Sequence, residues 1–140
     1  MPIDNIFGTT VNLLAKSIDL RSRNHTMISA NLANVETPEY TPKALSFEDE
    51  LKGALKGKKG GSPALTHPKH IPLKGQGNSI QQVQGEVIET PSLSPGKDGN
   101  GVELETEMSR MAENQIMYNA SIQILAKKFE GLKSAIRENK

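Results

Sequence analysis

The stretch LETEMSRMAENQIMYNASIQILAKKFEGLKSAI, residues 104–136, carries apolar side chains at alternating steps of four and three residues. Only Gln115 interrupts this stripe, whose other members are Leu104, Met108, Met111, Tyr118, Ile122, Leu125, Phe129, Leu132 and Ile136. Glutamates open the segment and basic residues close it, which is the charge order that the helix dipole favours. The pattern predicts one helix from about residue 102 to 138, on the order of 55 Å long at about 1.5 Å per residue.

A stripe with the same spacing runs through the N-terminal quarter of the chain. Its members are Phe7, Val11, Leu14, Ile18, Arg21, His25, Ile28 and Leu32. A 3.5-residue repeat kept over about four heptads is typical of a coiled-coil seam, because a helix on a broad globular core drifts toward 3.6. An ordinary amphipathic helix pair is the alternative interpretation.

The two helices are expected to pair antiparallel, because the chain must return after residue 35. One register places Leu32 level with Leu104, so that Arg21 faces Gln115. Polar residues would then share a layer of the seam and fix the register at some cost in stability. The predicted fold class is therefore mainly α, an antiparallel coiled-coil hairpin of the terminal helices.

Composition limits the functions open to this chain. Its 140 residues include three Phe, two Tyr and no Trp, so the core is thin and much apolar surface is expected to be buried between chains. A formal charge of +1 does not favour nucleic acid or an anionic membrane as the main partner. The absence of cysteine excludes disulfides and thiol catalysis. With no apolar window near ~18 residues and no cleaved-signal pattern at the N-terminus, any export is expected to be unconventional.

The middle of the chain, residues 42–101, differs in composition from both ends. Ser46 is a candidate N-cap for a short helix from about 47 to 56, and the stretch IQQVQGEVIET is compatible with one or two short strands. The connecting segments are rich in glycine, proline and lysine. We therefore expect a terminal domain formed by residues 1–41 and 102–140, and a middle segment that is flexible, irregular or weakly cored.

Candidate metal and catalytic sites are weak. His67 and His70 in HPKH could in principle bind a metal, but a proline lies between them and no cysteine or nearby carboxylate joins them. DGNGVELETEMS, from Asp98, resembles a calcium loop only at its start, so a turn before a helix capped by Asn100 explains it better. No nucleophile motif groups the Ser, His and Asp residues. We expect no enzyme, no metal and no cofactor.

The stretch ISANLANVETPEYTP at the end of the N-terminal helix places amides where a surface helix usually has charges. Asn31 and Asn34 are neighbours on one helix face, and Ala30 and Ala33 make a second pair beside them. Small side chains let another backbone approach, and each amide offers it donors and acceptors. Capping, with Asn34 left-handed and Pro38 ending the helix, is the other interpretation. On chemistry alone, contact with a neighbouring subunit and capping stay equally open.

Residues 29–51, SANLANVETPEYTPKALSFEDEL, resemble the N-terminal signature of the flagellar axial family of rod and hook proteins, usually S-x-N-L-A-N-x-x-T-P-G-Y followed by a basic residue. The matching residues are Ser29, Asn31, Leu32, Ala33, Asn34, Thr37, Pro38 and Tyr40. Glu39 stands where the family usually has Gly, and Thr41 where it has Lys or Arg. Without that glycine, the turn after Pro38 is not expected to take a positive φ.

Further segments are similar to the short proximal rod subunits of this family. They are LTHPKHIPL, DGNGVELETEMSRMAENQIMYNASIQIL and KKFEGLKSAI, and the similarity covers most of the chain. The neighbouring rod protein FlgC typically ends in an A-S-R-A-Y-Q-A-N-like run that is absent here, and distal rod and hook proteins carry larger inserted domains. A proximal rod subunit is thus the first choice, and FlgC is the alternative.

The resemblance implies a structural protein. Members are exported without cleavage by the flagellar type III apparatus, and their terminal helices pair to form the inner layer of a helical tube that transmits torque. Implied partners are FlgC and the distal rod proteins, the rod-to-ring adaptor, the membrane ring and the export gate. The matching motif residues are then expected to lie where adjacent subunits meet. The rival from another class is a cytosolic helical-hairpin adaptor or export chaperone that binds a partner helix in its groove.

Overall fold

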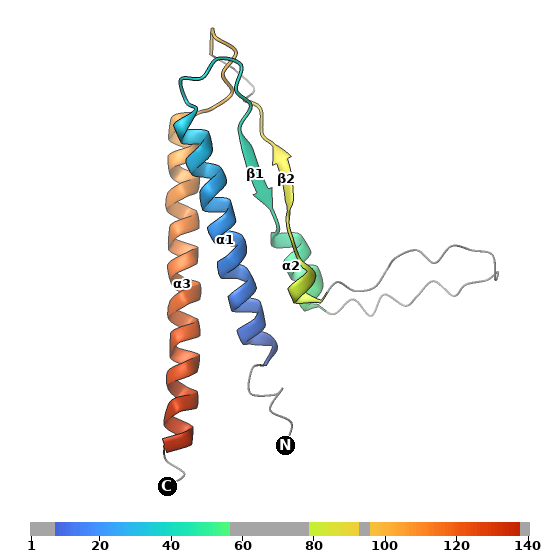
Figure 1. Ribbon diagram of the computed structural model, residues 1–140, viewed down its shortest axis with the longest axis vertical. Helices are drawn as coiled ribbons and strands as arrows, with labels where there is room; N and C mark the ends of the chain where they lie inside the picture. Colours follow the sequence, from blue (N-terminus) through green and yellow to red (C-terminus); the bar gives the residue numbers. More distant parts are fainter. Residues whose placement is uncertain (1–7, 57–78, 93–95, 138–140) are drawn as a thin grey trace, which may run out of the picture.

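Two long antiparallel helices lie side by side in the computed structural model, which describes residues 8–56, 79–92 and 96–137 (Figure 1). They are α1 (Thr9–Ala33) and α3 (Leu104–Arg137), and the start of α1 lies at the same end of the molecule as the end of α3. The predicted antiparallel pair of terminal helices is confirmed. α3 also begins and ends close to its predicted bounds, because the charge order and the regularly spaced apolar stripe are local properties of the sequence.

A two-stranded antiparallel sheet lies beside α1 on the side away from α3 (Figure 1). β1 (Lys43–Ser46) pairs with β2 (Glu86–Glu89), and α2 (Glu48–Leu55) follows β1 after one residue. The short 3₁₀-helix η2 (Ile80–Gln82) precedes β2. The described part of the chain thus has three layers, in the order α3, α1 and sheet, with α1 in the middle.

Two features of the middle segment differ from expectation. α2 confirms the predicted short helix, but the predicted cap Ser46 is wrong, because Phe47 occupies the N-cap position with φ −145° and forms no side-chain cap. The stretch IQQVQGEVIET contains one strand and the 3₁₀-helix η2. Strand β1 was not predicted, since its four residues KALS gain their partner only through the chain's return at β2.

The apolar core lies between α1 and the sheet layer. Leu20 of α1 is completely buried against Leu45, Phe47 and Val83 of the middle segment. Partly buried side chains surround this cluster, namely Met27, Leu51 and Ala54. The described parts of the middle segment therefore pack on α1, and the division of the chain into a terminal domain and a middle segment stays a prediction.

Candidate assembly surfaces

The most deeply buried side chains of α3, where it contacts α1, are polar. The buried residues of α3 are Glu107, Asn114 and Ser121, which recur every seven residues and so lie on one face. Asn31 of α1 donates Nδ2–H to Glu107 Oε2 at 2.8 Å, and Asn24 donates Nδ2–H to Asn114 Oδ1 at 3.4 Å. Because Asn24 and Asn31 are also seven apart, the two hydrogen bonds form successive layers of one helix contact.

These contacts correct the predicted register. Asn31 lies level with Glu107, which is two residues further along α3 than the prediction placed it. The Arg21 guanidinium also leaves the α3 contact, since it lies over the Phe47 ring at 5.5 Å from the centroid and pairs with Glu48 at 3.3 Å. A planar cation gains both the ring face and the carboxylate there, which explains why it points toward the sheet side of α1.

The apolar seam predicted on α3 needs a matching correction. One heptad position is half-buried, at Met111, Tyr118, Leu125 and Leu132. The remaining predicted members are exposed, namely Leu104, Met108, Gln115, Ile122, Phe129 and Ile136. On α1, the predicted members Val11, Leu14 and Ile18 are half-buried and Ile28 is buried. The polar layers occupy the position next to α1, so the second apolar stripe of α3 faces outward.

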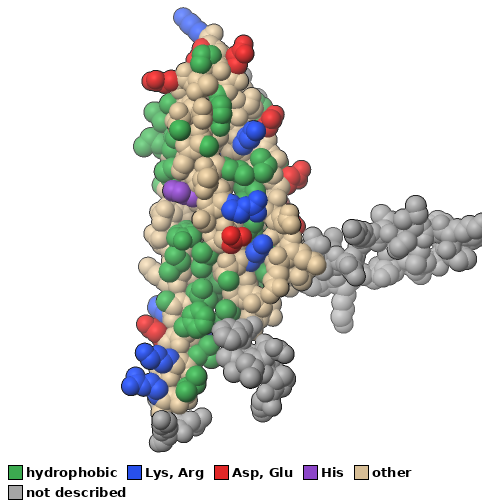
Figure 2. Space-filling view, viewed as in Figure 1, with side chains coloured by type: hydrophobic (Ala, Val, Ile, Leu, Met, Phe, Trp, Pro, Cys, Tyr) green, Lys and Arg blue, Asp and Glu red, His purple; other side chains and the backbone are tan. Residues whose placement is uncertain are grey.

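We call this second stripe the outer stripe, and it consists of Met108, Gln115, Ile122, Phe129 and Ile136. Met108 is 58% exposed and Ile136 is 73% exposed. In Figure 2, apolar side chains lie at the surface along the long helices. Regularly spaced, exposed, large apolar residues are typical of a surface that binds another protein.

The signature-motif amides form hydrogen bonds inside the chain. Asn31 is 1% exposed and bonds to Lys43, Tyr40 and Glu107, so the expectation that its amide is presented to a neighbouring subunit needs correction. Asn34 is the C-cap of α1, but with φ −107° and ψ 16° it is not left-handed as predicted.

The rest of the motif closes the turn after α1 or lies at the surface. Asn34 Nδ2 donates to the carbonyl of Ala30 at 2.8 Å, and its Oδ1 accepts from Thr37 Oγ1 at 3.1 Å. Ala30, Ala33 and Pro38 are exposed, whereas Ser29 and Leu32 are half-buried. Ala33 and Pro38 of the motif, with Ala30 beside them, are therefore open to contact by a neighbouring backbone.

Glu39 contradicts the expectation for the turn after Pro38. Its φ is 59°, in the left-handed region that a side chain rarely adopts, although the residue is not glycine. Its backbone N–H donates to the carbonyl of Asp98 at 3.1 Å, in the loop that precedes α3. The turn geometry is therefore kept without glycine, and this cross-loop bond helps to hold it.

Asn100 joins the C-terminal end of α1 to the segment before α3. Its Nδ2 lies 2.9 Å from the carbonyl oxygens of Asn34 and Val35 and 2.6 Å from that of Thr37. Its Oδ1 accepts from the N–H of Val102 at 2.6 Å. The prediction that it caps the C-terminal helix is wrong, because carbonyls left unpaired at the end of α1 attract its amide instead.

The residue directly before α3, Glu103, has a perturbed carboxyl. Ser92 Oγ donates to Glu103 Oε1 at 2.6 Å, and Thr106 Oγ1 donates to Oε2 at 3.0 Å. These bonds, that from Ser92 first, hold the pKa of Glu103 below its usual value.

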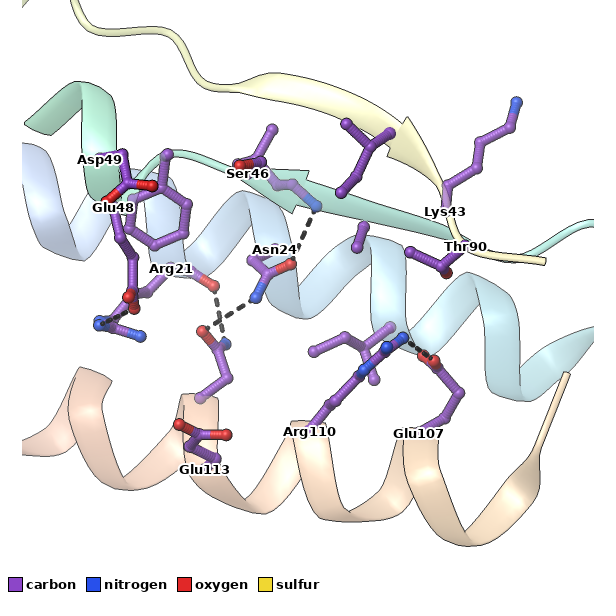
Figure 3. Close-up of a pocket in the computed structure, with 16 residues that line it drawn as sticks. Arg21, Asn24, Lys43, Ser46, Glu48, Asp49, Thr90, Glu107, Arg110 and Glu113 are labelled. Atoms are coloured by element: carbon purple, nitrogen blue, oxygen red, sulfur yellow. Dashed lines mark hydrogen bonds and ion pairs between the residues drawn. The ribbon is translucent and has the colours of Figure 1, made fainter. Parts of the chain in front are cut away.

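A groove of about 380 Å³ separates the sheet from α3, with α1 along its floor (Figure 3). Arg110 pairs with Glu107 at 2.6 Å on the α3 side, and Arg21 pairs with Glu48 on the sheet side. The lining contains no histidine or cysteine. Its arginines are thus committed to contacts that hold the layers together.

Sequence reasoning missed Asn24, Glu107 and Asn114 as contact residues. The sequence did contain a signal for them, because polar side chains recur every seven residues on both helices. The apolar stripe beside them was the stronger pattern. The histidines His67 and His70 lie outside the described residues. Within the part of the chain that the structure describes, no group of three or more His, Asp or Glu is placed to hold a metal ion. None of the helices described is long and apolar enough to cross a membrane.

Comparison with known proteins gives relatives but no matching family model. The flagellar basal body rod protein FlgB of Cereibacter sphaeroides is 29% identical over 131 residues, which is 94% of this chain and 96% of that protein. FlgB of Escherichia coli K12 is 27% identical over 126 residues, 87% of this chain and 88% of that protein. FlgB of Yersinia ruckeri is 27% identical over 127 residues, covering 88% and 90%. The chain is similar to FlgB proteins over nearly its full length.

The lengths of the matches bear on which parts are shared with the FlgB proteins. A match over 131 of 140 residues is too long to leave out either long helix or the sheet. The matched region therefore spans the segments that form the helix pair and the apolar core.

Proposed function

We propose that the chain is a structural subunit of the bacterial flagellar basal-body rod, in its proximal part. The observation that carries this proposal is the similarity to FlgB proteins over nearly the full length of both partners. The outer stripe supports it, because a subunit that polymerises through its terminal helices needs apolar helix surface outside its own fold.

The finer parts of the proposal follow from the resemblance to the rod family. The chain is exported by the flagellar type III apparatus without cleavage, then orders against its neighbours and transmits torque through the helix layer. Its partners are FlgC and the distal rod proteins, the rod-to-ring adaptor, the membrane ring and the export gate. The similarity to proteins named FlgB favours the position of FlgB in the proximal rod over the position of FlgC.

The proposal is tested in the bacterium that encodes the chain. Deleting its gene should abolish motility, and the complementing chain should be found in purified basal bodies. Ile122→Lys, on the outer stripe, should leave the helix content in circular dichroism unchanged but remove the chain from basal bodies. Gln123→Lys, at the next exposed position, is the matched control and should assemble.

Two results would contradict the proposal. A chain that stays in the cytosol and is absent from basal bodies would instead favour the adaptor or export chaperone. Normal assembly of the Ile122→Lys chain would show that the outer stripe is not an assembly surface.

A further inference from the structure

The Asn31 side chain connects three elements of the fold. Its Nδ2 donates to the carbonyl of Lys43 and to Glu107 Oε2, both at 2.8 Å. Its Oδ1 accepts from the N–H of Lys43 at 3.0 Å and from the Tyr40 hydroxyl at 3.3 Å. A carboxamide offers two donor hydrogens and two acceptor lone pairs, so the hydrogen-bonding capacity of this group is filled inside the chain.

Strand β1 has one edge paired with β2 and one edge turned toward α1. The N–H of Thr90 donates to the carbonyl of Pro42, beside the pair formed by Lys43 and Glu89. Because successive residues of an antiparallel strand direct their backbone groups to opposite edges, Lys43 and Leu45 present theirs away from β2. Asn31 thus occupies the place of a neighbouring strand at Lys43.

Asn24 repeats this arrangement two turns earlier on α1. Its Oδ1 accepts from the N–H of Leu45 at 3.4 Å, and its Nδ2 donates to Asn114 Oδ1 at 3.4 Å (Figure 3). These bonds are longer than those of Asn31, so this layer is the weaker of the two. Both asparagines nevertheless accept from a backbone N–H of β1 through Oδ1 and donate to a side chain of α3 through Nδ2.

Glu107 and the carbonyl of Lys43 together fix which way the Asn31 amide is turned, since both accept from its nitrogen. The Glu107 carboxylate is 2% exposed, pairs with Arg110 at 2.6 Å and accepts from Asn31. A carboxylate paired with arginine can only accept, so it requires the nitrogen of the amide on its side. The oxygen must then face the N–H of Lys43. Without the Glu107 acceptor, one donor hydrogen of the buried amide loses its partner, and only the bonds to Lys43 and Tyr40 orient the group.

We propose that Glu107 and Asn114 are positioning residues. They act through Asn31 and Asn24 on the edge of β1 that faces α1. Pairing of α3 with α1 is thereby coupled to attachment of the sheet, although α3 donates no hydrogen bond of its own to β1 in this contact. The coupling is reciprocal. Loosening the sheet therefore also leaves the Asn31 and Asn24 amides less well oriented for their hydrogen bonds to α3.

Amide hydrogen exchange of the full-length chain, read residue by residue by NMR, tests this coupling. Glu107→Leu should raise exchange at Lys43 about tenfold or more relative to Thr90, whose N–H is held by Pro42. Glu107→Gln keeps one acceptor oxygen for Asn31 and should restore Lys43 to within about threefold of the parent. Arg110→Ala is the matched control, because it removes the ion pair and leaves the Glu107 acceptor.

The second layer gives an independent readout. Asn114→Ala should raise exchange at Leu45 more than at Lys43, whereas Glu107→Leu should show the opposite order. This pattern distinguishes layer-by-layer positioning from a general loosening of the helix pair. If Glu107→Leu fails to fold, the comparison of exchange at Leu45 and Lys43 in Asn114→Ala still tests the proposal.

Three results would overturn the proposal. One is equal exchange at Lys43 and Leu45 in the Asn114→Ala chain. Another is an Arg110→Ala chain in which Lys43 exchanges as fast as in Glu107→Leu. The third is a parent chain in which the Lys43 amide exchanges without protection.

Discussion

Helix α1 is packed on two sides, and the two contacts differ in chemistry. Toward the sheet layer, Leu20 is completely buried among Leu45, Phe47 and Val83. Toward α3, the residues buried on the facing helix are polar, and Asn31 and Glu107 are joined by a 2.8 Å hydrogen bond. One contact therefore rests on removing apolar area from water, and the other on satisfying buried polar groups.

The difference shows that stability and specificity are supplied by different faces of one helix. Apolar contacts tolerate sliding, because any neighbouring apolar surface gives a similar free energy. Buried amides and carboxylates do not, because a shift leaves donors and acceptors unpaired at a cost of about 1–3 kcal/mol each. The fully buried apolar cluster thus lies on the sheet side, while the polar residues on the α3 side select the helix register.

The largest expected effect on stability comes from making a cavity in the apolar core between α1 and the sheet. Leu20→Ala should lower the free energy of unfolding by about 2–4 kcal/mol, because it leaves a cavity between α1 and the sheet. Urea unfolding followed by circular dichroism measures this change. Ile116→Ala on α3, where the side chain is 67% exposed, is the control and should change stability by less than about 0.5 kcal/mol. Similar losses in both variants would contradict the placement of the core.

A smaller effect is expected at the polar end of the helix pair. Asn100→Ala should cost about 1–3 kcal/mol, because the carbonyls of α1 that its amide serves lose their partner. Asn119→Ala removes an exposed amide that accepts only from Gln115 within the same helix, and about 0.5 kcal/mol or less is expected. The same urea titration compares the two. Equal losses would show that Asn100 is not a structural link.

The turn between the two sides gives a stabilising prediction. Glu39→Gly should raise the free energy of unfolding by up to about 1 kcal/mol, since it removes a side chain from the left-handed region. Glu36→Gly, in the same turn but without a positive φ, should instead destabilise by about 0.5–1 kcal/mol through the freedom of glycine in the unfolded chain. Thermal unfolding midpoints shifting in opposite directions would confirm this pair.

The smallest expected effect lies at the exposed rim of α3. Ser92→Ala should raise the pKa of Glu103 toward its usual value, and Thr106→Ala should raise it less. Because the folded pKa is the lower one, the hydrogen bonds stabilise the fold above the unfolded pKa and are lost as the pH falls through the folded pKa. NMR titration of the Glu103 carboxyl measures the shift, and an unchanged curve in Ser92→Ala would contradict the assigned cause.

The long helices could be predicted because their signals are local. Charge order, the regular spacing of apolar residues and Pro38 are all evident within one or two helical turns of the sequence. The register could not be predicted, since α3 offers two adjacent apolar stripes and the residues that select between them are polar. Burial of Glu107 is favourable only when Asn31 and Arg110 are already in place, and a single sequence does not show that.

Strand β1 and the motif interactions depend on residues far away in the chain. Lys43 joins a strand because Glu89 lies opposite it and Asn31 binds its backbone N–H and carbonyl, and neither is a sequence neighbour. The left-handed Glu39 is held by the carbonyl of Asp98, so the family's usual glycine gave the wrong expectation here. Motif recognition located these residues, but their contacts required the fold.

Asn100 also has a consequence for how the chain between the long helices can vary. Its amide closes a loop, since it reaches carbonyls 63 to 66 residues earlier in the chain. The entropy of closing a flexible loop depends only weakly on its length, and each doubling costs about 0.6 kcal/mol. Once the two ends of the helix pair are joined at this point, the intervening segment can be lengthened or shortened with little penalty to that junction. In a hairpin of this kind, segments of different length can therefore connect the two long helices while the junction at Asn100 is kept.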